Sequence, residues 1–182
     1  GSIAGQLAKL RGARVVGIAG RPDKCAWVVD ELGFDACIDH RAPDFYEQLK
    51  AATPHRVDVY FDNVGGAVLD AVLKRLAGHA RVVLCGAIAV YNAEHKQPGP
   101  ANYLELITQR ATMTGFNTFD HWDRFGAITD ELAGWIAEGR LRHREHVLDG
   151  LERAPEALNM LFTGENLGEI LVRVAEPDAD AG

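Results

Sequence analysis

Short apolar runs alternate with amphipathic segments along the first half of the chain. The apolar runs are rich in β-branched residues, as is typical of strands buried on both faces of a parallel sheet. They predict strands at Arg14–Ala19, Ala36–Asp39, Val57–Phe61 and Arg81–Leu84. The segments between them, with apolar residues three or four positions apart, predict helices at Gly1–Leu10, Asp23–Leu32, Asp44–Ala52 and Ala67–Leu76. This alternation predicts an α/β fold, a doubly wound and mostly parallel sheet with helices on both faces.

The second half is less regular, and a turn-rich loop interrupts it at residues 97–100. Its patterns predict helices at Tyr103–Arg110, Asp123–Gly139 and Ala154–Thr163, and strands at Ala111–Phe116 and Glu169–Val174. The inner face of the longest helix would carry Phe125, Ile128, Leu132, Trp135 and Ile136. No linker divides residues 1–175, so we predict one domain there, followed by a disordered acidic tail at 176–182.

The stretch 81–92 is where we expect a ligand. Its strand ends at Leu84, just before Cys85, and Gly86 and Ala87 leave the backbone bare enough for a flat ligand to approach. Tyr91 follows on the loop beyond the strand's carboxyl end, which is the edge where ligands bind in open α/β sheets. Cys85 could equally be an ordinary buried small residue, and Tyr91 an ordinary surface tyrosine.

The amino-acid composition argues against some classes of binding partner. The 182 residues carry a net charge of −7 without a run of basic residues, so nucleic acid and anionic membrane surfaces are not expected partners. The three cysteines are far apart and lack metal-ligand spacing, which suits a reducing compartment, and we expect a cytoplasmic protein. No metal site is expected.

The predicted strand at Arg14–Ala19 bears on the choice of cofactor. NAD sites usually place Asp or Glu at the end of this strand to bind the adenosine ribose. Here the strand runs into Gly20 and Arg21 without an acid, and Lys24 lies one helical turn further on. A cofactor's 2′-phosphate would find a small backbone and two cations there. An ordinary solvated helix start is the alternative interpretation of Arg21 and Lys24.

Four segments in order carry a family resemblance. They are Gly1–Lys9, Tyr60–Gly66, Cys85–Ile88 with Tyr91 and Asn92, and Gly164–Gly168. With them, nearly the whole chain resembles the cofactor domain of zinc-independent medium-chain dehydrogenases/reductases, in the prostaglandin reductase (leukotriene B4 dehydrogenase, 2-alkenal reductase) branch. The resemblance implies a Rossmann-like NADP(H)-binding domain and reduction of the carbon–carbon double bond of α,β-unsaturated aldehydes and ketones, with no metal.

The resemblance also implies what surrounds these residues in the whole protein. The family's glycine-rich phosphate loop ends where Gly1 stands, and the strand before it lies in the middle of the sheet. A barrel-like domain that supplies part of the substrate pocket precedes that strand. We therefore expect an N-terminally truncated domain with its first strand missing, which alone should not turn over an enone. Family dimers join through the strand that matches Ala111–Phe116, so we expect a homodimer.

Roles can be carried over one position at a time. The resemblance implies that Lys24 holds the 2′-phosphate, with His40 beside it where the family usually has a tyrosine. Tyr91 would donate to the nicotinamide ribose and the substrate carbonyl, stabilising the enolate charge rather than acting as an obligatory acid. The other cofactor-binding residues implied are Gly1, Asn63, Cys85, Gly86, Ala87, Phe116 and Asn166.

Other interpretations of the sequence stay open. Asn63 could simply favour the turn before Gly65, Phe116 could be core, and Asn166 could cap the last turn. A quinone oxidoreductase of the same superfamily is the nearest alternative function, and a non-catalytic nucleotide-binding module is another. Tyr91 does not begin the Tyr-x-x-x-Lys motif of short-chain dehydrogenases, because the fourth residue after it is His95.

Overall fold

The computed structural model describes residues 1–175, so the predicted disordered tail at 176–182 lies outside the described residues. The chain divides into two compact units, Gly1–Leu141 and Arg142–Gly182. The prediction that residues 1–175 form one domain stays a prediction.

The first unit alternates helices and strands as the pattern predicts. Its strands are β1 (Val16–Ala19), β2 (Ala36–Asp39), β3 (Val57–Asp62), β4 (Leu76–Leu84) and β5 (Thr112–Gly115). Its α-helices are α1 (Ser2–Leu10), α2 (Pro22–Asp30), α3 (Phe45–Ala52), α4 (Gly66–Leu73), α5 (Glu105–Thr108) and α6 (Phe125–Ala137). Two 3-10 helices, η1 (Ile88–Val90) and η2 (Thr118–Arg124), follow β4 and β5.

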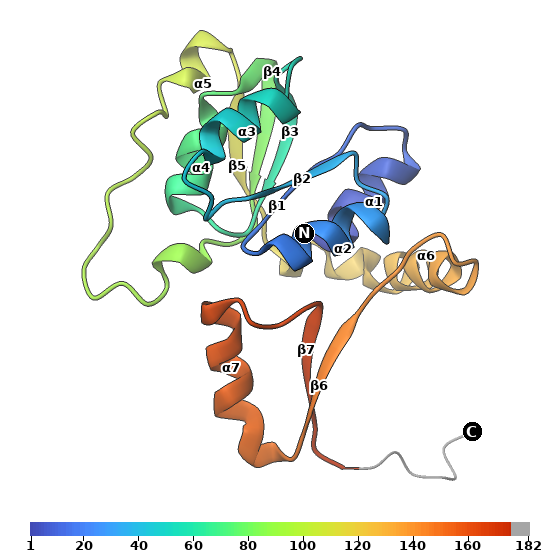
Figure 1. Cartoon of the computed structure of the whole chain (residues 1–182). Coiled ribbons are helices and arrows are strands. Elements are labelled where there is room, and N and C mark those ends of the chain that lie inside the picture. Colours follow the sequence, from blue (N-terminus) through green and yellow to red (C-terminus); the bar gives the residue numbers. More distant parts are fainter. Residues whose placement is uncertain (176–182) are drawn as a thin grey trace. The chain divides into compact units, whose positions relative to one another are not determined.

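All strand pairs of the first unit are parallel. β1 pairs with β2, and β3, β4 and β5 form a second sheet in which they lie side by side, as Figure 1 shows. The predicted α/β, Rossmann-like fold is thereby confirmed. The strands predicted as one sheet are nevertheless found in separate sheets, because no strand within residues 1–175 joins β1 to β3.

Several element boundaries differ from the prediction. The helix predicted to reach Leu76 ends at Leu73, because Leu76 already begins β4 and pairs with Val57 of β3. Apolar residues continue at helical spacing up to Leu76, so the pattern alone extends the helix too far. The helix predicted at Tyr103–Arg110 is also shorter, since only Glu105–Thr108 is α-helical.

The cores of the first unit form where helices cover strands. Leu69 and Leu73 of α4 pack with Leu76 and Val82 of β4 in one buried cluster. A second cluster joins Ile38 of β2, Leu49 of α3 and Val72 of α4. Helix α4 therefore contributes to both clusters, which fixes it against the strands β3 and β4.

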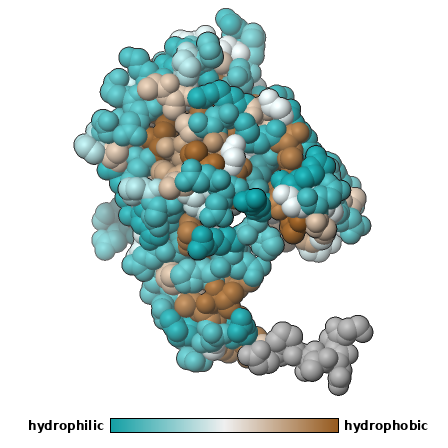
Figure 2. Space-filling model, turned by 45° about the vertical axis from the view of Figure 1, so that its right-hand side comes forward, coloured by the Kyte–Doolittle hydropathy of each residue, from teal (hydrophilic) through white to brown (hydrophobic). Residues whose placement is uncertain are grey.

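The inner face predicted for the long helix is not buried. The segment begins as the 3-10 helix η2, and α6 contains no buried residue. Phe125, Ile128 and Ile136 are each more than a third exposed. Figure 2 likewise shows hydrophobic residues at the surface among hydrophilic ones on the face in view. Helical spacing thus located the helix but not a partner for its apolar face.

The second unit is a single strand–helix–strand motif. Strand β6 (Glu145–Asp149) leads through η3 (Leu151–Arg153) and α7 (Ala154–Thr163) to β7 (Glu169–Arg173), which pairs parallel with β6. The sequence predicted α7 and β7 but missed β6, whose only adjacent apolar residues are Val147 and Leu148. Helix α7 ends at Gly164 in the left-handed conformation that favours glycine. Within residues 1–175, no helix is both long and apolar enough to cross a membrane.

Candidate functional site

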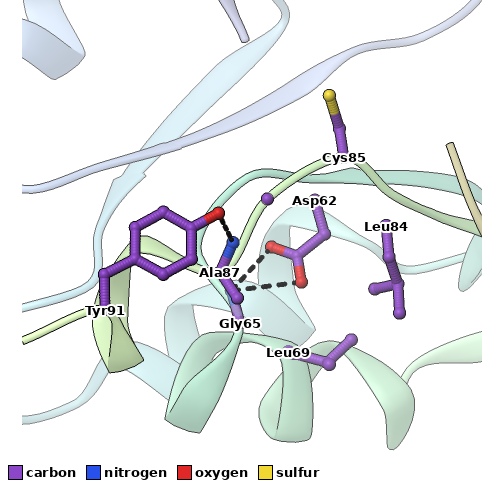
Figure 3. A pocket seen from close by; sticks show the side chains of 8 residues that line it. Asp62, Gly65, Leu69, Leu84, Cys85, Ala87 and Tyr91 are labelled. Carbon is purple, nitrogen blue, oxygen red and sulfur yellow. Dashed lines mark hydrogen bonds between the residues drawn. The ribbon is translucent and has the colours of Figure 1, made fainter. Parts of the chain in front are cut away.

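A hollow of about 250 Å³ opens at the carboxyl ends of β3 and β4 (Figure 3). Parallel strands end at the same edge of their sheet, so the turn after β3 and the loop after β4 meet there. The lining residues are Asp62, Gly65, Leu69, Leu84, Cys85, Gly86, Ala87 and Tyr91. This volume is below the roughly 300–1,000 Å³ of pockets for whole drug-sized ligands, so it suits one ring of a larger ligand.

A buried carboxylate organises the turn after β3. The side chain of Asp62 is almost fully buried, and its Oδ1 accepts hydrogen bonds from the Val64 N–H at 2.9 Å and the Gly65 N–H at 3.1 Å. The Tyr60 hydroxyl donates to the same oxygen at 2.9 Å. Burial and the neighbouring Asp62 charge raise the pKa of Tyr60, so its phenol remains a donor. These bonds satisfy the carboxylate in a place where an unpartnered charge would be costly.

The same turn holds the loop after β4. The carbonyl oxygen of Asp62 accepts from the N–H of Cys85 at 2.8 Å and of Gly86 at 3.1 Å. The carbonyl oxygen of Asn63 accepts from the Ile88 N–H at 3.2 Å. The two segments that face the hollow are therefore bound to each other by backbone hydrogen bonds.

Glycine is required at two positions in this arrangement. A Cβ at Gly86 would lie 3.2 Å from the Asn63 carbonyl oxygen and 3.4 Å from the Tyr91 hydroxyl. Gly65 has a φ of 69° and would bring a Cβ within 3.3 Å of the Ala87 side chain. The bare backbone expected from the sequence thus permits the close approach of the two segments.

The phenol of Tyr91 is oriented by the backbone of its own loop. Its oxygen accepts a hydrogen bond from the Ala87 N–H at 3.0 Å (Figure 3). This bond uses a lone pair and leaves the hydroxyl hydrogen able to donate to a ligand. The side chain is 62% exposed, so a ligand can reach that hydrogen without rearrangement of the loop.

A group of cations gathers at the end of β1. A Cβ at Gly20 would lie 2.9 Å from His40 Nε2 and 3.3 Å from Arg41 Nε, so both side chains lie against this glycine. Lys24 joins them from α2, and its pKa is lowered by burial and then by Arg21, with Arg41 also contributing. Closely spaced cations favour an anionic ligand because their mutual repulsion is relieved by its charge.

The remaining predicted residues lie elsewhere. Phe116 follows β5, donates its N–H to the Leu84 carbonyl oxygen at 2.9 Å, and stacks on His121 at a centroid distance of 5.2 Å. Gly1 precedes α1 and accepts from the Gly5 N–H at 3.0 Å. Asn166 belongs to the second unit, where its amide donates to the Gly168 carbonyl oxygen at 2.8 Å.

Sequence reasoning overlooked Asp62 and Arg41. An acidic residue followed by Asn and two glycines at a strand end is a signal for a side-chain-stabilised turn, and it could have identified Asp62. Arg41 follows His40 directly and could have been grouped with Lys24 as a third cation.

No group of three or more His, Cys, Asp or Glu side chains in residues 1–175 is positioned to hold a metal ion.

Comparison with known proteins identifies the family. Residues 1–134 match the family described as zinc-binding dehydrogenase. The chain is 41% identical over 183 residues to the NADPH-dependent curcumin reductase of Escherichia coli (strain K12), covering 98% of this chain and 53% of that protein. It is 39% identical over 178 residues to prostaglandin reductase 1 of Bos taurus, covering 95% and 53%.

A solved structure gives the same result. The crystal structure of CurA from Vibrio vulnificus in complex with NADPH superposes with a TM-score of 0.91 at 44% identity, covering 97% of this chain and 54% of that one. The chain thus spans about half the length of these relatives. The chain belongs to the zinc-binding dehydrogenase family, and within the medium-chain dehydrogenases/reductases to its zinc-independent prostaglandin reductase branch.

Proposed function

We propose that the protein containing this chain reduces the carbon–carbon double bond of α,β-unsaturated aldehydes and ketones with NADPH. The observation that carries the proposal is the Tyr91 phenol, held by Ala87 at the hollow with its hydrogen left for a ligand. Two relatives named above as an NADPH-dependent curcumin reductase and a prostaglandin reductase support the same class of reaction.

The residues present fit the cofactor at two places. Lys24, His40 and Arg41 offer cations and donors for a 2′-phosphate at Gly20, where a NAD site would usually carry an acid. The bare backbone at Gly86 offers a surface for the nicotinamide side. The further contacts in this proposal are those of Gly1, Asn63, Cys85, Ala87, Phe116 and Asn166.

The proposed reaction requires little general acid or base catalysis from the protein. NADPH, when bound, supplies a hydride to the β-carbon of the substrate. The carbonyl oxygen then gains negative charge, and the Tyr91 hydroxyl stabilises that charge by donating to it. Because the Ala87 N–H donates to the phenol oxygen, it polarises the hydroxyl and fixes its direction. Water supplies the proton that the α-carbon finally takes up.

A panel of acceptors tests the proposal. The full-length protein would be assayed by NADPH oxidation with a 2-alkenal, an enone, a quinone, and the saturated analogues of the first two. Turnover of the alkenal and enone but not of their saturated analogues is expected. Turnover of the quinone alone would favour the quinone oxidoreductase alternative, and binding of NADPH without any turnover would favour a non-catalytic module.

A further inference from the structure

The group at Gly20 contains one histidine, His40, beside Arg41. Lysine and arginine side chains ordinarily carry a charge at neutral pH, whereas an unperturbed histidine side chain changes charge between about pH 5 and 8. His40 Nε2 lies at the same face of Gly20 as the Arg41 guanidinium. Any anion bound against Gly20 would therefore meet an imidazole whose charge depends on pH.

We propose that His40 is a proton-linked specificity residue: it binds the cofactor's 2′-phosphate as an imidazolium, so the preference for NADPH over NADH rises as the pH falls. This inference rests on the proposed function, since it assigns the 2′-phosphate to the group at Gly20. The residue that the family usually has at this position is a tyrosine, whose side chain does not change its protonation state near neutral pH.

The surroundings of His40 favour its neutral form in the absence of a bound anion. Burial lowers its pKa first, then the nearby Arg41, and Lys24 from α2 acts in the same direction. Asp39 on β2 is the acid that opposes them, and its Oδ1 already accepts from the Arg41 N–H at 2.9 Å. At the start of α2, Asp23 forms an ion pair with Arg21 at 2.6 Å.

A phosphate bound at Gly20 would shift the protonation equilibrium of His40 toward its charged form. Its negative charge stabilises the imidazolium and raises the pKa of His40 above that of the free protein. His40 should then take up a proton when NADPH binds at pH values between its free and bound pKa. The contribution of His40 to the affinity should fall as the pH rises through the bound pKa and level off below the free pKa.

The phosphate group has its own titration, with the opposite sign. A phosphate monoester has a second pKa of about 6, so binding of the dianion releases protons at acid pH. That release is common to every variant, and NADH lacks the phosphate altogether. Comparison of variants and of the two cofactors therefore isolates His40.

The test is calorimetric titration of the full-length protein with NADPH and NADH at neutral pH, in two buffers of different ionisation enthalpy. The variants are His40→Gln, His40→Tyr and, as a matched control, His55→Gln, which changes an exposed turn residue. We expect net proton uptake with NADPH but not with NADH in the unmutated protein and in His55→Gln. Both His40 variants should lose that uptake.

A pH series completes the test. The ratio of the NADH and NADPH dissociation constants, measured from about pH 5.5 to 8.5 around the ordinary histidine pKa, should change about tenfold more in the unmutated protein than in His40→Tyr. NADPH preference with equal pH dependence in both would overturn the role of His40 alone. Equal affinity for the two cofactors at every pH would instead overturn the 2′-phosphate site itself.

Discussion

The Tyr91 hydroxyl oxygen lies 3.0 Å from the backbone nitrogen of Ala87, and it is the acceptor in that hydrogen bond. The three residues between these positions form the 3-10 helix η1, so a short loop both presents the phenol and aims it. A buried network of side chains is not needed for this purpose, which explains how an exposed tyrosine can hold a defined direction.

Replacement of Tyr91 by Phe removes the donor to the substrate oxygen and keeps the ring. We expect kcat for enone reduction to fall by up to about 10²–10³-fold, the loss typical of one donor to a developing oxyanion, with little change in NADPH affinity. Tyr103→Phe is the matched control, because Tyr103 is also more than half exposed but does not line the hollow. Unchanged turnover of Tyr91→Phe, with chemistry rate-limiting, would make Tyr91 an ordinary surface residue.

Asp62→Asn should destabilise the protein and loosen the site. The carboxylate accepts from Tyr60, Val64 and Gly65, and an amide in its place presents hydrogens to some of these donors. We expect the free energy of unfolding to fall by about 1–3 kcal/mol, measured by urea denaturation.

Asp58→Asn provides the comparison for this prediction, since Asp58 lies exposed on the same strand. Its unfolding free energy should stay within about 0.5 kcal/mol of the unmutated protein. Equal effects of the two substitutions would show that the buried carboxylate does not hold the turn.

Lys24→Ala should weaken NADPH binding selectively. The loss of one charge-assisted hydrogen bond to the 2′-phosphate is worth about 1.5–3 kcal/mol, or roughly 10- to 100-fold in the dissociation constant. NADH binding should change little, and Lys50→Ala on the exposed face of α3 should leave both constants unchanged. A parallel loss for NADPH and NADH would assign Lys24 to the scaffold instead.

The edge strand β5 is the expected dimer contact. It pairs with β4 along one edge, and its residues Thr112–Gly115 carry no charge, whereas exposed edges usually carry one to prevent pairing. Thr114→Lys should convert a homodimer to a monomer in light scattering at micromolar concentration, and Thr129→Lys on α6 should not. A monomeric unmutated full-length protein would contradict this proposal.

The sequence predicted the fold class and the neighbourhood of the hollow, since both follow from local patterns. Buried strands are recognisable by their apolar runs, and the strand-end rule located Tyr91 and Gly86. Strand β6 was not predicted because its sequence, from Glu145 to Asp149, is mostly polar. The strand depends on its pairing with β7.

The connections within the site were not predictable in the same way. The role of Asp62 depends on three donors that converge only when the turn has formed, and spacing in the sequence does not reveal that convergence. Arg41 lies beside Gly20, and close enough to Lys24 to lower its pKa, only through the pairing of β1 with β2.

The position of the transferred hydride tests the central proposal most directly. The full-length protein would be incubated with an enone and NADPH deuterated at the transferable C4 position, and the product analysed by NMR. Our account predicts a saturated ketone with deuterium on the β-carbon and an intact carbonyl group. Deuterium on the carbonyl carbon, in an allylic alcohol, would contradict it.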